Sequence, residues 1–309
     1  MASTKLQMTS LTLLPKAPFD FGHTLTFLEE HKANGIVRKI LENELRFAMN
    51  ISGKPVSFFV KSMGTPKKPR LELTLHAKKL NDDIIRQAKE QLIFYLSLDD
   101  DLTPFYKLAD KDEAFKPVLR KLYGYHQVKF PSIFTSVCWA LVTQRTPNSF
   151  AYLTMQRFCE LLGDAITVDG ERYTTFPEAK RFLDSRGLNA RDKVLIATNN
   201  TRKTDRLMEI AKAYTSVDEN YLKRASYDEA LRTVKKLKGL GQWSAEYVLL
   251  RGLGRYERTG WTDTVILESI SQIYTGGFRI SEGDAKKLAE YYGWYQGLWF
   301  HYVKVFVND

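Results

Sequence analysis

The stretch LKGLGQWSAEYVLLRGLGRYERTGWTDTV, residues 237–265, decides how the second half of the chain is interpreted. Gly239-Leu240-Gly241 separates two segments with helical apolar spacing, which predicts a tight turn between two helices. Such a turn exposes unpaired backbone amides at the start of the second helix, and amides of this kind bind phosphate without reading base sequence. A turn with a purely structural role has the same pattern.

Asp263 is the candidate reactive residue of this stretch. It follows Trp261-Thr262 and precedes Thr264-Val265, where a new apolar-periodic segment begins. The position is typical of a helix N-cap, and the amides and positive end of a helix would also keep the carboxylate ionised. An ionised carboxylate that faces a cleft can stabilise positive charge on a sugar or orient a water molecule.

Aromatic residues accompany this candidate. Trp243 and Tyr247 are four positions apart and share one face of the second helix, while Trp294 and Trp299 lie near the carboxyl end. Aromatic residues at helical spacing usually belong to a core. Beside a phosphate-binding turn and a carboxylate, they can instead form a box that stacks on an extruded base and attracts a cationic one.

Composition sets wider bounds. A length of 309 residues suggests two domains, and 44% hydrophobic with 27% charged residues is typical of a globular protein. The net charge of +10 favours a polyanionic partner without identifying it. No apolar segment reaches the roughly 18 residues of a membrane span and the start lacks a signal pattern, so we expect an intracellular protein. Cys138 and Cys159 cannot supply a four-cysteine metal site or an iron–sulfur cluster, and we expect them in the core.

The first half predicts an antiparallel sheet with covering helices. A change to helical spacing from Asp82 indicates a helix that packs on the sheet. The domain is expected to close near residue 115, which divides the chain into residues 1–115 and 116–309. The segments expected as strands are residues 11–14, 24–27, 45–51, 56–60 and 71–75.

The second half predicts a mostly helical domain, so the fold class is α+β. Residues 227–251 are expected to form a helical hairpin, and Asp169-Gly170 interrupts the helices with a short irregular insert at residues 166–173. The segments with helical spacing are residues 134–141, 151–162, 205–214, 227–237 and 244–250.

Residues 237–247, followed by Arg251-Gly252 and Thr262-Asp263, resemble the helix-hairpin-helix glycosylase superfamily, with its hairpin and downstream catalytic aspartate. Within it the chain most resembles the 3-methyladenine DNA glycosylase II branch, the bacterial AlkA type. Further stretches that carry this likeness are Pro18-Phe19-Asp20-Phe21, Leu102-Thr103-Pro104-Phe105-Tyr106, Val118-Leu119-Arg120 and Leu141-Val142-Thr143-Gln144-Arg145.

The resemblance implies a role for each matching residue. Asp263 matches the catalytic aspartate, and Gln144 and Arg145 lie where the family fills the gap left by a flipped nucleotide, although a surface helix end is an equal alternative. The resemblance implies a base pocket lined by Trp243, Tyr247 and Trp294. It implies that Gly239, Leu240 and Gly241 hold DNA phosphate.

The implied reaction is hydrolysis. Superfamily members that also cut the backbone carry a lysine in the slot of Trp243, because an amine forms a Schiff base with the sugar. We therefore expect a monofunctional glycosylase for alkylated bases such as 3-methyladenine in base excision repair. It would act as a monomer on damaged double-stranded DNA, in the cytoplasm or nucleoid of a prokaryote or the nucleus of a eukaryote. The resemblance implies no required cofactor and no metal, and allows a monovalent cation at the hairpin turn.

Two departures leave alternatives open. Gln144-Arg145 replaces the family's Gln-Gln, and the segment after Trp294 lacks the common Pro-Trp-Arg. Uracil, hypoxanthine or 8-oxoguanine are alternative target bases. A non-catalytic module that binds damaged DNA is the alternative from another functional class.

Overall fold

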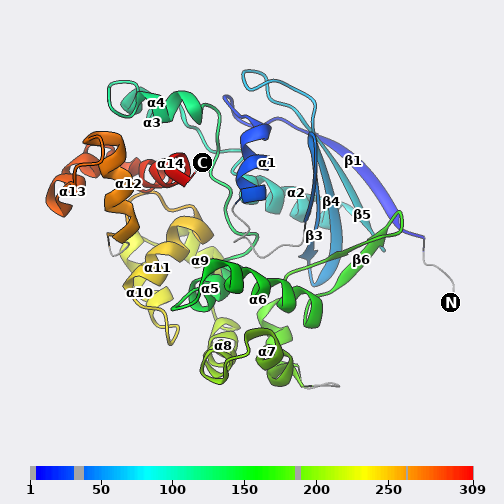
Figure 1. Cartoon of the computed structure of the whole chain (residues 1–309). Helices are drawn as coiled ribbons and strands as arrows, with labels where there is room; N and C mark the ends of the chain where they lie inside the picture. The colour runs from blue at the N-terminus through cyan, green and yellow to red at the C-terminus, as the bar shows by residue number, and fades with distance from the viewer. Residues whose placement is uncertain (1–4, 31–37, 185–188, 262–263, 309) are drawn as a thin grey trace.

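A computed structural model describes residues 5–30, 38–184, 189–261 and 264–308. A five-stranded antiparallel sheet occupies one side of the molecule, and helices from the rest of the chain occupy the other (Figure 1). The expected α+β class is confirmed.

The sheet has the strand order β1-β5-β4-β3-β2, and all its pairs are antiparallel. The strands β3 and β4 form a hairpin in which Ile51 lies opposite Lys54, so only Ser52 and Gly53 form its loop. Both loop residues have positive φ, 50° and 73°, which matches the right-handed twist of the strands. The strands are β1 (Gln7–Leu13), β2 (Arg38–Leu41), β3 (Glu44–Ile51), β4 (Lys54–Ser62) and β5 (Leu71–Ala77).

The expectation of a strand at residues 24–27 is wrong, because these residues lie in helix α1 (Phe21–Glu30). Asp20 Oδ1 accepts from the amide of Gly22 at 2.8 Å and so caps the helix start. Phe21, Thr24, Leu25 and Leu28 are buried, which is helical spacing. The alternation Thr-Leu-Thr-Phe is too short to separate one helix face from a strand.

The two faces of the sheet are covered by different parts of the chain. Phe47 faces helix α2 (Asp82–Leu96), where its ring lies 5.6 Å from that of Tyr95. The next residue, Ala48, faces the opposite way and packs against Tyr173 of a second hairpin, β6 (Ala165–Val168) and β7 (Glu171–Thr174). The insert expected to be irregular is therefore a two-stranded sheet that turns at Asp169-Gly170.

The expected helical segments are confirmed, except that residues 244–250 are split. The six-residue α-helix α11 (Gln242–Tyr247) continues as a π-helix, η3 (Val248–Leu253). The remaining helices are α3 (Thr103–Ala109), α4 (Lys116–Lys121), α5 (Ile133–Val142), α6 (Asn148–Leu161), η2 (Ala179–Leu183), α7 (Ala190–Thr198), α8 (Thr201–Tyr214), α9 (Glu219–Arg224), α10 (Tyr227–Lys235), α12 (Thr264–Tyr274), α13 (Glu282–Tyr291), η4 (Gly293–Tyr295) and α14 (Gln296–Asn308).

Two large apolar clusters form the core. One lies among α5 to η3, and the other joins the sheet and α1–α4 to α12–α14, so the two ends of the chain share a core. In the second cluster Trp299 is fully buried and stacks on Tyr292 at 5.5 Å. Cys138 and Cys159 are buried, as expected. A boundary near residue 115 stays a prediction. In the described parts of the chain, no helix has the length and apolar character to cross a membrane.

Candidate active site

The predicted hairpin turn connects α10 to α11. The amide of Leu240 donates to the carbonyl of Leu237 at 3.0 Å, and the Leu240 side chain is buried in the core. Gly239 has φ +104°, and a β-carbon there would lie 3.0 Å from Arg206 Nη1, so the turn requires glycine. Gly241 precedes α11 as its N-cap with extended backbone. The backbone at Gly239 and Gly241 is therefore not covered by side chains of its own.

The predicted aromatic pair lies on the helix that follows this turn. The rings of Trp243 and Tyr247 stack with centroids 5.4 Å apart and an angle of 25° between their planes. Phe130 lies 6.1 Å from the Tyr247 ring, edge to face. Trp243 and Tyr247 are half-buried, whereas Ser244 and Ala245 are buried. Part of the stacked pair is therefore accessible, as a base-stacking platform requires.

Gln144 and Arg145 are neighbours in sequence with different environments. The Gln144 side-chain amide donates to the carbonyl of Gly239 at 2.9 Å and to Ser244 Oγ at 3.2 Å. Arg145 is exposed, and its φ is 52°, which is uncommon outside glycine. The structure thus joins Gln144 to the hairpin and leaves the Arg145 side chain facing solvent.

Asp263 lies outside the described residues. Helix α12 begins at Thr264, where the sequence predicts a helix start. Trp294 lies in η4 and is 72% exposed, and no described ring contact joins it to Trp243 or Tyr247. The grouping of the hairpin turn with the stacked pair is therefore the part of the candidate site that the structure describes.

Sequence reasoning did not identify Glu246, which lies beside the stacked pair on α11. Its side chain is half-buried, and this burial raises the pKa of the carboxyl. Gln242 Nε2 donates to Glu246 Oε1 at 2.6 Å, while a β-carbon on Gly260 would lie 3.1 Å from Oε2. Glu246 therefore packs against the segment that leads to Asp263. In the sequence, a single Glu between aromatic residues does not indicate a contact with the distant Gly260 segment.

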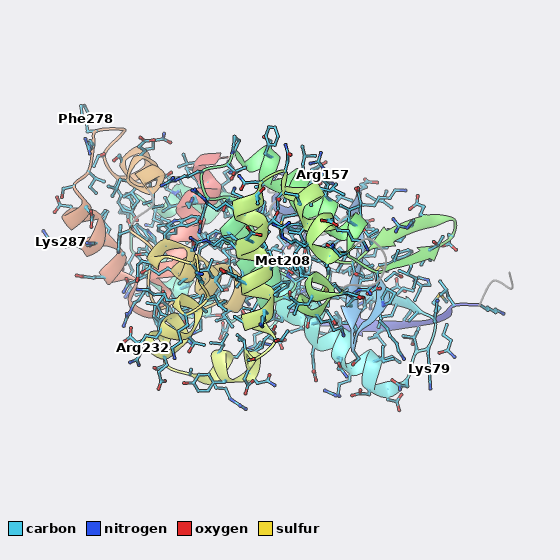
Figure 2. All side chains as sticks on the ribbon, turned by 90° about the horizontal axis from the view of Figure 1, so that it is seen from below. Lys79, Arg157, Met208, Arg232, Phe278 and Lys287 are labelled. Carbon is cyan, nitrogen blue, oxygen red and sulfur yellow. The ribbon has the colours of Figure 1, made fainter. Side chains whose placement is uncertain are left out.

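The lysines near the hairpin do not occupy the position of Trp243, and they contact other residues. Lys235 Nζ donates to Gln242 Oε1 at 2.8 Å, and Lys238 pairs with Glu209 at 3.1 Å. Basic side chains also occur far from the hairpin, since Lys79 and Lys287 lie at opposite ends of the molecule (Figure 2). The net positive charge is therefore not confined to the candidate site.

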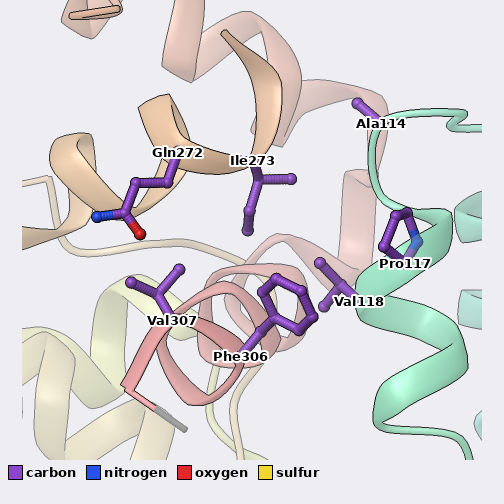
Figure 3. Close-up of a pocket in the computed structure, with 7 residues that line it drawn as sticks. All are labelled: Ala114, Pro117, Val118, Gln272, Ile273, Phe306 and Val307. Atoms are coloured by element: carbon purple, nitrogen blue, oxygen red, sulfur yellow. The ribbon is translucent and has the colours of Figure 1, made fainter. Parts of the chain in front are cut away.

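A hollow of about 410 Å³ lies elsewhere, between α4, α12 and α14 (Figure 3). Val118, Ile273 and Phe306 give it apolar walls, and none of the predicted site residues lines it. Among the residues that the structure describes, no group of three or more His, Cys, Asp or Glu is placed to hold a metal ion. Neither feature adds to the candidate site.

Comparison with known proteins shows the fold. No protein-family model matches the chain. A DNA-3-methyladenine glycosylase of Bacillus subtilis (strain 168) is 30% identical over 182 residues, which is 56% of this chain and 59% of that protein, less than two thirds of its length. A solved 3-methyladenine DNA glycosylase from Archaeoglobus fulgidus has a TM-score of 0.80 at 20% identity, covering 96% of this chain and 98% of its own. An 8-oxoguanine glycosylase/lyase from Clostridium acetobutylicum has a TM-score of 0.70 at 14% identity, covering 96% and 97%. The resemblance to DNA glycosylases found in the sequence agrees with these likenesses, and the chain has the fold of these solved DNA glycosylases.

Proposed function

We propose that this chain is a DNA glycosylase that takes an alkylated base, such as 3-methyladenine, out of double-stranded DNA and hydrolyses its N-glycosidic bond. The observation that carries the proposal is the stacked Trp243–Tyr247 pair on the helix that directly follows the Gly239–Gly241 turn. Backbone amides for phosphate and an aromatic platform for a base thus lie next to each other. The relatives named above as 3-methyladenine glycosylases support this substrate class.

The reaction needs few groups because an alkylated purine already carries positive charge. Stacking on Trp243 and Tyr247 would favour such a cation by about 0.5–2 kcal/mol. The carboxylate of Asp263 would stabilise the positive charge that develops on the deoxyribose as the bond to the base breaks. Water then adds to the anomeric carbon, its proton goes to solvent, and the base leaves as a neutral molecule.

Cleavage of the DNA backbone is not part of the proposal. The slot in which a lyase needs an amine holds Trp243, and an indole forms no Schiff base. Lys235 and Lys238 are exposed and paired with Gln242 and Glu209. Because one solved neighbour is named a glycosylase/lyase, base release and strand cleavage need separate measurement.

No cofactor enters the proposed reaction. A monovalent cation at the hairpin turn stays a prediction. The carbonyls of Leu237 and Gly239 already accept hydrogen bonds from the Leu240 amide and from Gln144, so a cation would have to share these oxygens. A monomeric enzyme on damaged double-stranded DNA remains the proposed working form.

The test is base release from methylated duplex DNA by the wild type and Asp263→Asn, with strand cleavage scored separately. Asp284→Asn, in helix α13, is the matched control, because the described contacts of this exposed carboxylate are with Ser281 and Lys287, which are near it in the chain. We expect the wild type and the control to release 3-methyladenine without cleaving the strand, and Asp263→Asn to bind DNA without releasing base. Release only from uracil, hypoxanthine or 8-oxoguanine DNA would replace the substrate, and binding without any release would support a non-catalytic module. Strand cleavage by the wild type would refute the hydrolytic mechanism.

A further inference from the structure

The connector, residues 255–260, joins η3 to the stretch that holds Asp263, and one of its side chains reaches into the core. The Tyr256 hydroxyl donates to Asp100 Oδ2 at 2.6 Å. Lys129 Nζ lies 3.3 Å from Oδ1 and 3.4 Å from Oδ2 of the same carboxylate. Tyr256, Asp100 and Lys129 therefore form one network around a single carboxylate.

Lys129 fixes this carboxylate in place. Its side chain is only 6% exposed, and its ammonium lies 5.1 Å from the centre of the Phe94 ring. The amide of Lys129 donates to the carbonyl of Tyr95 at 2.9 Å, which ties the residue to the end of α2. A buried cation needs its counter-ion, because loss of one partner leaves an uncompensated charge. Asp100 is thus a rigid acceptor that the amino-terminal half supplies for Tyr256.

The connector is held on its other sides as well, through its backbone and its arginine side chains. The amide of Gly297, in α14, donates to the carbonyl of Tyr256 at 2.8 Å, and a β-carbon on Gly297 would lie 3.0 Å from the carbonyl oxygen of Arg258. Arg255 Nη1 donates to the carbonyl of Ala225 at 2.9 Å. The Arg258 guanidinium contacts both carboxylate oxygens of Asp228, at 2.7 and 3.2 Å. The connector is therefore anchored to α14, to α10 and, through Tyr256, to the amino-terminal half.

We propose that Tyr256 is a positioning residue, and that its bond to the Asp100–Lys129 pair is how the amino-terminal half of the chain sets the place of the residues that follow the connector. This inference rests on the proposed function, in which Asp263 acts at the sugar. Tyr256 touches neither base nor sugar and acts through the connector. A misplacement of about 1 Å far from the reacting atoms can cost roughly 100-fold in rate. The amino-terminal half thereby gains a role beyond stability.

The test compares Tyr256→Phe with Tyr173→Phe. Both variants remove a tyrosine hydroxyl that donates to a carboxylate, and Tyr173 donates to Glu171 at 2.7 Å in the distant β6–β7 hairpin. The measurements are the single-turnover rate of 3-methyladenine release, the Kd for the same duplex, and hydrogen exchange of a peptide that covers the connector. We expect Tyr256→Phe to lose about 10- to 100-fold in rate, with a Kd within twofold of wild type and faster exchange in the connector.

The control should keep the wild-type rate and the wild-type exchange in the connector. A Tyr256→Phe rate within twofold of the control would overturn the inference, as would a loss confined to DNA affinity. If the wild type itself releases no base, the proposed function fails. Hydrogen exchange of the connector then tests by itself whether Tyr256 holds the connector in place. Unchanged exchange of the connector in Tyr256→Phe would overturn it in that case.

Discussion

Replacement of Gln144 tests whether this residue holds the hairpin in place. Its amide donates one hydrogen bond to the carbonyl of Gly239 and one to Ser244 Oγ, and both partners are in the hairpin. A net contribution of about 0.5–1.5 kcal/mol for each bond predicts that Gln144→Ala lowers the free energy of unfolding by about 1–3 kcal/mol. Gln144→Glu keeps the shape but removes the donor, so it should destabilise at least as much.

Arg145→Ala is the matched control. The Arg145 side chain is exposed, so its removal should change the free energy of unfolding by less than about 0.5 kcal/mol. The assay is urea unfolding at pH 7 with a shared m-value for the three variants, followed by binding to undamaged and abasic duplexes. If Arg145 fills the gap left by a flipped nucleotide, Arg145→Ala should lose more affinity for abasic than for undamaged DNA.

Two results would refute this reasoning. A Gln144→Ala protein as stable as wild type, within about 0.5 kcal/mol, would mean that the two bonds contribute nothing net. A Gln144→Glu protein of wild-type stability would mean that the amide does not donate to Gly239. In either case Gln144 would return to the gap-filling role that the resemblance implies.

Three further predictions follow from single sites. Gly254 has φ +70°, and a β-carbon there would lie 2.1 Å from Lys129 Cε, so Gly254→Ala should lower the free energy of unfolding in urea by about 2–4 kcal/mol. Gly276 has φ +62° with open space around it, so the control Gly276→Ala should lower it by only about 1–2 kcal/mol. Equal losses for the two variants would show that the Lys129 side chain moves aside without cost. Burial lowers the pKa of His76 from 6.5 in the folded protein, so the unfolded chain takes up the proton at a higher pH. The stability that the neutral His76 contributes above about pH 6.5 should therefore be lost as the pH falls toward the folded-state pKa. His76→Gln should reduce the slope of the urea midpoint between pH 7 and 5, and an unchanged slope would contradict this. Trp243→Leu should lower the ratio of 3-methyladenine to hypoxanthine release by about 2- to 30-fold, the equivalent of 0.5–2 kcal/mol, and an unchanged ratio would exclude a cation–π contribution.

Local pattern determined the elements with the clearest periods. Alternation in residues 45–51, 56–60 and 71–75 predicted three strands, and apolar spacing predicted α2, α5, α6, α8 and α10, because the 2.0 and 3.6 periods follow from backbone geometry. The same reasoning failed at residues 24–27 and 166–173. There a four-residue alternation and a short turn-containing run fit more than one structure, and packing decided between them.

The sequence likewise predicted some features of the candidate site and not others. The Gly239–Gly241 turn and the shared face of Trp243 and Tyr247 were predictable, since each depends on residues within four positions. Because residue 243 is a tryptophan and not a lysine, the sequence also predicted hydrolysis, which stays a proposal. Trp294 was expected at the same pocket, and its exposure and lack of a described ring contact with the pair leave that role untested.

Only the tertiary structure placed partners that are distant in sequence. Gln144 lies 95 positions from Gly239, and Tyr256 lies 156 positions from Asp100. No local period encodes such pairs, because many buried acceptors in a chain of 309 residues could satisfy each donor. The sequence by itself determined the elements with a long regular period, the Gly239–Gly241 turn and the shared helix face of Trp243 and Tyr247. The shared core of α12–α14 with the amino-terminal sheet, a product of apolar burial over the whole chain, decided how those elements hold the connector.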